Sequence, residues 1–240
     1  MMRLDKFLTV TGIGSRSENR DYIKRNMVSV NGTIVTKPEH KIDEQGDEIC
    51  FDGRRVNYKS YQYYLFYKPA GCITANSDAT HKTVMDYFPI SLRKGLSPVG
   101  RLDKDTEGLL LITNDGALNH RLMSPSKHVS KTYYAILDQK VPESAISAFK
   151  QGIDIGDDKL TKPAELQILP DEMINGKIRY SAELTLTEGR YHQVKRMFYA
   201  VGCEVLYLKR VSIGGLTLNG VKPGEFRELT ESEIEGLKNE

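Results

Sequence analysis

Residues 100–108, which read GRLDKDTEG, form the densest polar segment of the chain and contain three carboxylates. Asp103, Asp105 and Glu107 alternate along the chain, so an extended backbone would place their side chains on one face. Three converging carboxylates could bind Mg²⁺ or Mn²⁺, as in a metal-dependent nuclease or phosphotransferase. Alternatively, one carboxylate lies in a cleft and acts as a nucleophile, or all three are exposed loop and capping residues. Spacing alone leaves the three interpretations open.

Basic residues are concentrated in three segments, although the net charge of the chain is only +2. Residues 3–25 carry six basic and three acidic side chains, and residues 189–210 carry five basic side chains and one acid. Residues 120–131 carry three basic side chains, two histidines and no acid, whereas residues 225–240 are acidic. Separate basic segments are typical of a protein that contacts a polyanion at several places. Each segment alone could also be ordinary solvated surface.

The composition is that of a globular protein. With 240 residues, of which 39% are hydrophobic and 28% charged, the chain can bury a substantial core in one or two domains. Cys50, Cys72 and Cys203 are far apart, so we expect neither a disulfide framework nor a cysteine zinc site. The first ten residues lack the apolar run of a signal peptide, and the apolar stretch 109–112 is too short to cross a bilayer. We therefore expect a cytoplasmic protein that binds no membrane.

Residues 1–58 are predicted to form a small α/β domain that begins with two helices. Leu4, Phe7 and Leu8 have the spacing of a short opening helix. Ser15, followed three residues later by Glu18, forms a capping box that begins a second helix. On that helix Arg16, Arg20 and Lys24 recur every four residues on the exposed face, where like charges repel. This pattern favours an anionic partner.

Two tight hairpins complete the small domain. Segments 28–30 and 33–35 flank Asn-Gly, and segments 48–51 and 54–56 flank Asp-Gly, dipeptides that suit type I′ turns. Two helices on two hairpins make a unit of about sixty residues, near the lower limit for independent folding. We expect its boundary within residues 57–62.

Residues 63–240 are predicted to form a larger α+β domain. We expect strands at 63–67, 108–113, 131–137, 164–168, 178–186, 204–208 and 215–218, and helices near 84–88, 117–123, 143–150 and 194–201. Strands outnumber helices and do not alternate regularly with them. This pattern predicts a mixed, largely antiparallel β-sheet rather than a doubly wound fold.

Four motifs in this larger part resemble those of pseudouridine synthases. GRLDKDTEGLLLITNDG, from Gly100, resembles the family's central motif, in which the aspartate after Arg-Leu is the essential nucleophile. KPAG at 68–71, KTYYAIL at 131–137 and EGRYHQVKRMF at 188–198 resemble the companion motifs. Tyr67 replaces an asparagine often found in the family. The resemblance covers residues 63–230 and implies an isomerase that converts a uridine of RNA to pseudouridine with no metal and no cofactor.

The resemblance also implies roles for individual residues. Asp103 would be the nucleophile, and Tyr133 would stack on the target base and handle the proton at C5. Lys195 would form an ion pair with Asp103 in the free enzyme, and Arg101 would help to hold the flipped uridine. Further residues expected to contact RNA are Arg3, Arg16, Arg20, Lys24, Arg25, Arg190, His192 and Gln193.

The N-terminal part separately resembles the S4-like RNA-binding domain, shared by a small-subunit ribosomal protein and tyrosyl-tRNA synthetases. RLDKFL, SR and VSVNGTIV carry this resemblance. Together with DKLTKPAEL at 158–166, the appended domain resembles the branch acting on small-subunit ribosomal RNA, although a large-subunit branch shares the architecture. A noncatalytic RNA-binding assembly factor would have the same basic segments and stays open as an alternative. We expect a monomer whose partner is ribosomal RNA, free or in an assembling subunit.

Overall fold

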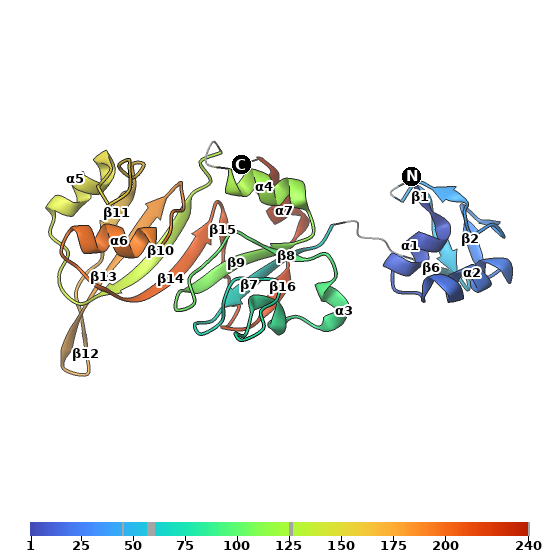
Figure 1. Cartoon of the computed structure of the whole chain (residues 1–240), viewed down its shortest axis with the longest axis horizontal. Helices are drawn as coiled ribbons and strands as arrows, with labels where there is room; N and C mark the ends of the chain where they lie inside the picture. Colours follow the sequence, from blue (N-terminus) through green and yellow to red (C-terminus); the bar gives the residue numbers. More distant parts are fainter. Residues whose placement is uncertain (45, 57–60, 125–126, 240) are drawn as a thin grey trace. The chain divides into compact units, whose positions relative to one another are not determined.

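The structure is a computed structural model that describes residues 1–44, 46–56, 61–124 and 127–239. It divides into two compact units, Met1–Ser60 and Tyr61–Glu240, each with its own hydrophobic core (Figure 1). The boundary expected over residues 57–62 falls mostly on residues 57–60, which lie outside the described part of the chain.

The first unit contains two helices and short antiparallel strands. The helices are α1 (Leu4–Val10) and α2 (Arg16–Lys24), and four strands form a sheet of order β3-β2-β5-β6. A separate antiparallel pair consists of β1 (Met2–Arg3) and β4 (Lys41–Ile42). The four strands of the sheet are β2 (Val28–Val30), β3 (Thr33–Ile34), β5 (Ile49–Phe51) and β6 (Arg54–Arg55). The predicted helices and hairpins are confirmed.

Local sequence signals explain where these elements begin and turn. The Ser15 hydroxyl accepts a hydrogen bond from the Glu18 backbone, and the Glu18 carboxylate accepts one from the Ser15 backbone at 2.8 Å. This capping box satisfies backbone donors that the first turn of α2 would otherwise leave unpaired. The Asn31-Gly32 and Asp52-Gly53 turns have positive φ at both residues, as type I′ turns require.

One ten-stranded sheet organises the second unit. Its main path is β11-β13-β10-β14-β9-β7-β16, and β12, β15 and β8 pair beside it. In chain order the strands are β7 (Tyr63–Lys68), β8 (Ser97–Val99), β9 (Glu107–Thr113), β10 (Lys131–Leu137), β11 (Glu165–Ile168), β12 (Glu172–Ile174), β13 (Lys177–Leu186), β14 (Val205–Ile213), β15 (Leu216–Thr217) and β16 (Phe226–Glu228). The predicted mixed, largely antiparallel sheet is confirmed.

A short parallel contact joins the two halves of this sheet. β9 and β14 pair through Glu107 with Lys209 and Gly108 with Arg210, whereas the other strand pairs are antiparallel. Gly108 has a φ of 110°, and a Cβ there would lie 2.2 Å from the Arg210 carbonyl oxygen. Only glycine therefore permits this close approach.

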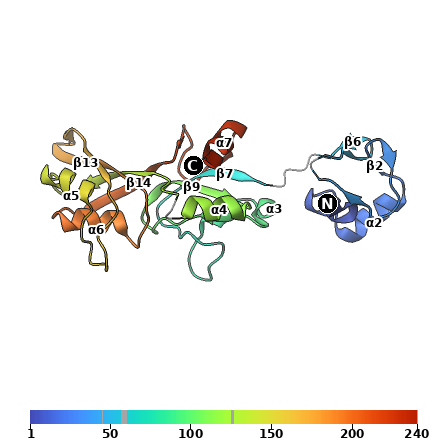
Figure 2. The same cartoon turned by 90° about the horizontal axis from the view of Figure 1, so that it is seen from above.

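Helices cover the sheet in two groups. Helices α4 (Gly116–Met123) and α7 (Glu231–Asn239) pack with the apolar residues on one face of β7 and β9. Helices α5 (Ser144–Gln151) and α6 (Gln193–Ala200) lie beside β13 and β14, apart from α4 and α7 (Figure 2). Phe149 of α5 and Phe198 of α6 meet edge to face, with ring centroids 5.7 Å apart. They share a core with Tyr133, so α6 covers the face of β10 that bears this tyrosine.

Several elements differ from the sequence prediction. The strand expected at 204–208 continues to Ile213, because polar residues at 209 and 210 hide its extent in the apolar pattern. The acidic tail forms β16 and α7, which the pattern did not predict. The helix expected near 84–88 is a 3₁₀ turn, η1 (Val84–Tyr87), followed by the short α3 (Ile90–Arg93).

Candidate active site

A buried lysine holds the loop that carries Asp103. This loop comprises residues 100–106, between β8 and β9. Lys68, at the end of β7, is completely buried, and its Nζ donates to the carbonyl oxygens of Thr106 at 2.8 Å, Pro69 at 3.1 Å and Lys104 at 3.3 Å. Desolvation on burial lowers the pKa of Lys68. Its three donors therefore fix the backbone that follows Asp103.

Residues just after Lys68 hold the same loop on its other side. The Thr74 hydroxyl donates to the Leu102 carbonyl at 2.8 Å and accepts from the Leu102 backbone at 3.1 Å. The Gly71 backbone donates to the Lys104 carbonyl at 2.8 Å. The segment that begins with KPAG thus positions the backbone on both sides of Asp103. Sequence reasoning gave KPAG only as part of the family resemblance and missed the positioning roles of Lys68 and Thr74.

The start of α6 faces Asp103 and Asp105. His192 Nε2 lies 3.6 Å from Asp103 Oδ1, and Lys195 Nζ lies 2.7 and 2.6 Å from the two carboxylate oxygens of Asp105. The hydrogen bond from Lys195 holds the pKa of the Asp105 carboxyl below its usual range. His192 has a left-handed backbone with a φ of 49° and caps α6. This conformation turns the chain so that both side chains reach the Asp103 loop.

The prediction that Lys195 pairs with Asp103 is therefore wrong, because Lys195 pairs with Asp105 instead. The side chain of Asp105 is 71% exposed and that of Asp103 is 30% exposed. Asp103 and Asp105 are two residues apart in the same loop, and the flexible Lys195 side chain pairs with Asp105, the more exposed of the two. Because an ion pair this exposed contributes only about 0–1 kcal/mol, Lys195 can leave Asp105 when a substrate approaches at little energetic cost.

Tyr133 lies on β10, on the face covered by α6. It is 8% exposed and belongs to the same buried cluster as Val194 of α6. Its hydroxyl lies 3.5 Å from Nη1 of Arg210, its cross-strand neighbour on β14. Arg210 is a buried cation that sequence reasoning missed.

The side chains of Arg190 and Gln193 form hydrogen bonds within the protein. The Arg190 guanidinium donates to the backbone carbonyls of residues 159 and 160, both at 2.7 Å, and pairs with Asp157 and Glu188, each at 3.3 Å. Gln193 is buried, accepts from the Arg190 backbone at 2.9 Å and donates to Glu188 at 2.7 Å. These bonds fix the turn before α6. The RNA contact expected for the two side chains therefore gains no support from their geometry.

In the first unit, three of the arginines expected to contact RNA surround one buried carboxylate. Asp5 is completely buried, and Arg3, Arg16 and Arg20 approach it at 2.8, 3.6 and 3.4 Å. The hydrogen bond from Arg3 holds the pKa of the Asp5 carboxyl below its usual range. Arg16 and Arg20 keep more than half of their side-chain surface exposed. Three cations around one anion leave a positive surface that can bind phosphates.

The remaining predicted residues lie on the surface. Lys24 and Arg25, at the end of α2, are exposed, and so is Arg101, two residues before Asp103. Glu107 differs from its neighbouring carboxylates, since it accepts hydrogen bonds from the hydroxyls of Tyr207 at 3.0 Å and Tyr67 at 3.3 Å. The carboxylates at 103, 105 and 107 therefore have separate partners.

The described residues offer neither a cluster of metal ligands nor a membrane-spanning helix. No group of three or more His, Cys, Asp or Glu side chains in the described ranges is arranged to hold a metal ion. Within the same residues, no helix has the length and hydropathy needed to cross a bilayer.

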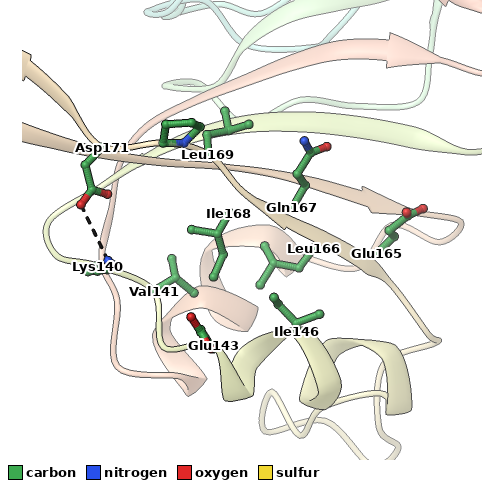
Figure 3. Close-up of a pocket in the computed structure, with 11 residues that line it drawn as sticks. Lys140, Val141, Glu143, Ile146, Glu165, Leu166, Gln167, Ile168, Leu169 and Asp171 are labelled. Carbon is green, nitrogen blue, oxygen red and sulfur yellow. Dashed lines mark ion pairs between the residues drawn. The ribbon is translucent and has the colours of Figure 1, made fainter.

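A surface hollow lies elsewhere on the second unit, between α5 and the edge strand β11 (Figure 3). Its volume is about 700 Å³. Val141, Ile146 and Leu166 contribute apolar surface, and Lys140 and Asp171 form an ion pair of 3.8 Å at one end. None of the predicted site residues lines it, so this hollow is not the candidate active site.

Comparisons with known proteins agree with the geometry. Residues 62–200 match the family model of RNA pseudouridylate synthases, and residues 2–49 match that of the S4 domain. The chain is 44% identical to an uncharacterized RNA pseudouridine synthase, YtzG, of Bacillus subtilis over 97% of both chains. It is 41% identical to ribosomal small subunit pseudouridine synthase A of Haemophilus influenzae over 98% of this chain and 99% of the relative. The corresponding Escherichia coli protein is 39% identical over 97% and 98%.

A solved structure described as a pseudouridylate synthase superimposes with a TM-score of 0.69 and 40% identity over 99% of this chain and 100% of that one. Together with the family match, this similarity defines the class of the protein. It is an RNA-modifying isomerase in which an S4 domain precedes the catalytic domain in the sequence. The chain belongs to the RNA pseudouridine synthase family.

Proposed function

We propose that the protein converts a uridine of small-subunit ribosomal RNA to pseudouridine, with Asp103 as the nucleophile. The identity of about two residues in five to relatives named for small-subunit ribosomal RNA, over nearly the whole of both chains, supports the target. Asp103 is supported by its place on a backbone fixed from both sides and facing the basic start of α6. Under this proposal the protein acts as a cytoplasmic monomer, and its partner is ribosomal RNA, free or in an assembling subunit.

The reaction needs bonds to be exchanged without any change in composition. The bond between uracil N1 and the ribose breaks, the base turns, and C5 bonds to the same ribose carbon. C5 then loses its proton and N1 gains one, so substrate and product are isomers. Asp103 engages the ribose, either covalently or by assisting a glycal route.

The surrounding residues divide the remaining work. Lys195, released from its exposed pair with Asp105, supplies positive charge beside the reacting carboxylate and the RNA backbone. Arg101, exposed beside the loop, helps to hold the uridine out of its stack, which costs a few kcal/mol. Because Tyr133 is 8% exposed, it offers little ring area for stacking in the free protein. Proton handling at C5 by its hydroxyl is the role that its geometry favours.

The N-terminal unit positions the substrate. The exposed guanidinium groups of Arg16 and Arg20, together with Lys24 and Arg25 at the end of α2, form a positive surface. Phosphate contacts of this kind fix where an RNA lies without reading its sequence. They therefore supply affinity, while the choice of uridine depends on the catalytic unit.

The proposal is tested by mapping pseudouridine in ribosomal RNA from cells that lack the protein. We expect one small-subunit position to lose its modification and to regain it on expression of the wild type but not of Asp103→Asn. Loss at a large-subunit position would assign the protein to that branch instead. An unchanged pseudouridine map would contradict catalysis on ribosomal RNA, and restoration by Asp103→Asn would contradict the nucleophile.

A further inference from the structure

Arg210 occupies the junction between the two halves of the catalytic sheet. On β14 it is the partner of Tyr133 on one side and of Gly108 on the other. Gly108 is the second residue of β9, directly after the Asp103 loop and Glu107. Because it has no side chain, β9 can approach the Arg210 backbone closely. Arg210 thus lies between the strand that bears the proposed proton acceptor and the strand that continues from the proposed nucleophile.

The hydrogen bonds of this arginine are incomplete. Its side chain is only 3% exposed; Nε donates to the Leu109 carbonyl at 2.7 Å, and Nη1 lies 3.5 Å from the Tyr133 hydroxyl oxygen. Nη2 is buried and has no hydrogen-bond partner in the described structure. A buried donor without a partner costs about 1–3 kcal/mol, and more when the group is charged.

The charge of Arg210 is also not balanced locally. Among the described residues, no carboxylate lies within ion-pair distance of it. A second buried cation lies on the neighbouring strand: Lys131, two residues before Tyr133 on the same face of β10, donates to the Val129 carbonyl at 2.9 Å. Burial and, to a smaller extent, Arg210 lower the pKa of Lys131. Among the described residues, the buried guanidinium at the Tyr133 oxygen therefore has no paired carboxylate.

Burial restricts what Arg210 can act on. RNA that approaches from solvent cannot reach a buried Nη2, in contrast to the exposed Arg101. The Tyr133 oxygen already lies at Nη1, and a guanidinium presents neighbouring donors as a fork that can hold one acceptor between them. Negative charge on that oxygen would supply the acceptor that Nη2 lacks.

We propose that Arg210 is a positioning residue for proton transfer at C5 of the target uracil, acting through the Tyr133 oxygen. In this step the proton of C5 passes to the Tyr133 oxygen, whose own proton has passed to water, and N1 takes a proton from water. Arg210 holds the oxygen in place and stabilises the negative charge that it carries in between. This inference rests on the proposed function, and in particular on Tyr133 as the proton acceptor.

The test compares turnover of RNA carrying uridine with that of RNA carrying 5-deuterouridine at the target position. In Arg210→Met, kcat should fall by about 10- to 100-fold, less than the roughly 100- to 10,000-fold that a proton-transferring group itself contributes. KM should stay within about twofold because Arg210 does not touch RNA. Proton removal should then limit the rate, so the ratio of kcat for the two substrates should rise above the wild-type ratio. Arg210→Lys, which keeps the charge but not the fork, should be intermediate in both.

The matched control is Lys209→Met on the neighbouring position of β14. Its Nζ lies 4.9 Å from the centre of the Tyr67 ring, and alternation along the strand places it on the opposite face from Arg210. We expect this variant to keep the wild-type isotope ratio. An isotope effect that also rises in the control would overturn the inference, since it would then not depend on the Tyr133 side of the sheet.

The outcomes separate this inference from the proposed function. If wild type forms pseudouridine but Arg210→Met keeps the wild-type kcat, the inference alone is wrong. A lower kcat with an unchanged isotope ratio would show that Arg210 supports only the fold. Should Arg210→Met lack a cooperative thermal transition, the ratio measured with Arg210→Lys decides in the same way. Absence of pseudouridine formation by the wild type would instead overturn the proposed function itself.

Discussion

Replacing Lys68 with methionine tests how the Asp103 loop is held. Methionine is similar in length but cannot donate, so the change leaves the carbonyls of Pro69, Lys104 and Thr106 without the ammonium that they share. The ammonium is completely buried. The same change therefore removes a costly buried cation as well as its hydrogen bonds.

The magnitude follows from these two opposing effects. A carbonyl left without any partner costs about 1–3 kcal/mol, but the Lys104 carbonyl keeps the Gly71 backbone donor. Removal of the desolvated charge returns part of the loss. We expect Lys68→Met to lower the free energy of unfolding by about 2–4 kcal/mol at pH 7. Activity should fall further than stability explains, because even a small shift of the Asp103 backbone misplaces the reacting carboxylate.

The pH dependence of stability distinguishes the charge from the bonds. Burial lowers the pKa of Lys68 in the folded protein, so the unfolded chain binds more protons between that lowered value and about 10.4. Wild-type stability should therefore gain from Lys68 as pH rises through this window. Denaturant unfolding at a series of pH values should show that Lys68→Met loses this gain. Equal slopes in both proteins, or full activity of the variant, would refute a loop held by a buried ammonium.

Three other substitutions test separate parts of the structure. Asp105→Asn should change stability by less than about 1 kcal/mol and leave most activity, because Lys195 stays available to the site; a loss as large as that of the nucleophile variant would contradict the exposed pair. Arg20→Ala should weaken RNA binding and reduce the slope of log affinity against log salt by about one phosphate contact; an unchanged slope would contradict a phosphate contact. Gly108→Ala should cost about 2–5 kcal/mol in thermal or denaturant unfolding, because its Cβ meets the β14 backbone at 2.2 Å. Its control, Gly116→Ala, meets no atom within 4 Å and should be neutral or slightly stabilising.

Local signals predicted the first unit well. Ser15 and Glu18 begin α2, and Asn31-Gly32 turns a hairpin, because each of these effects depends on residues only a few positions apart. The same reasoning predicted β10 over its full length, since its buried and half-buried residues alternate. Features that depend on distant residues were harder. The parallel contact of β9 with β14 joins residues about a hundred positions apart. The close approach at Gly108 that permits this contact is visible only in the structure.

The site shows the same division. Motif order was sufficient to bring Asp103, Tyr133 and Lys195 forward as candidates, but side-chain direction within a turn cannot be read from spacing. For that reason Lys195 was paired with the wrong aspartate. Arg210 was overlooked because the predicted strand ended at residue 208 and Arg210 counted only as part of a basic segment, whereas it lies in β14 and is buried beside Tyr133.

The central claim is that the Asp103 carboxylate carries out the chemistry, and one measurement tests it most directly. Purified wild type and Asp103→Asn are incubated with small-subunit ribosomal RNA that contains C5-tritiated uridine, and released tritium is counted alongside RNA affinity. We predict that the wild type releases tritium, whereas the variant binds RNA with nearly the same affinity and releases none. Tritium release by Asp103→Asn at a rate near that of the wild type would contradict the account.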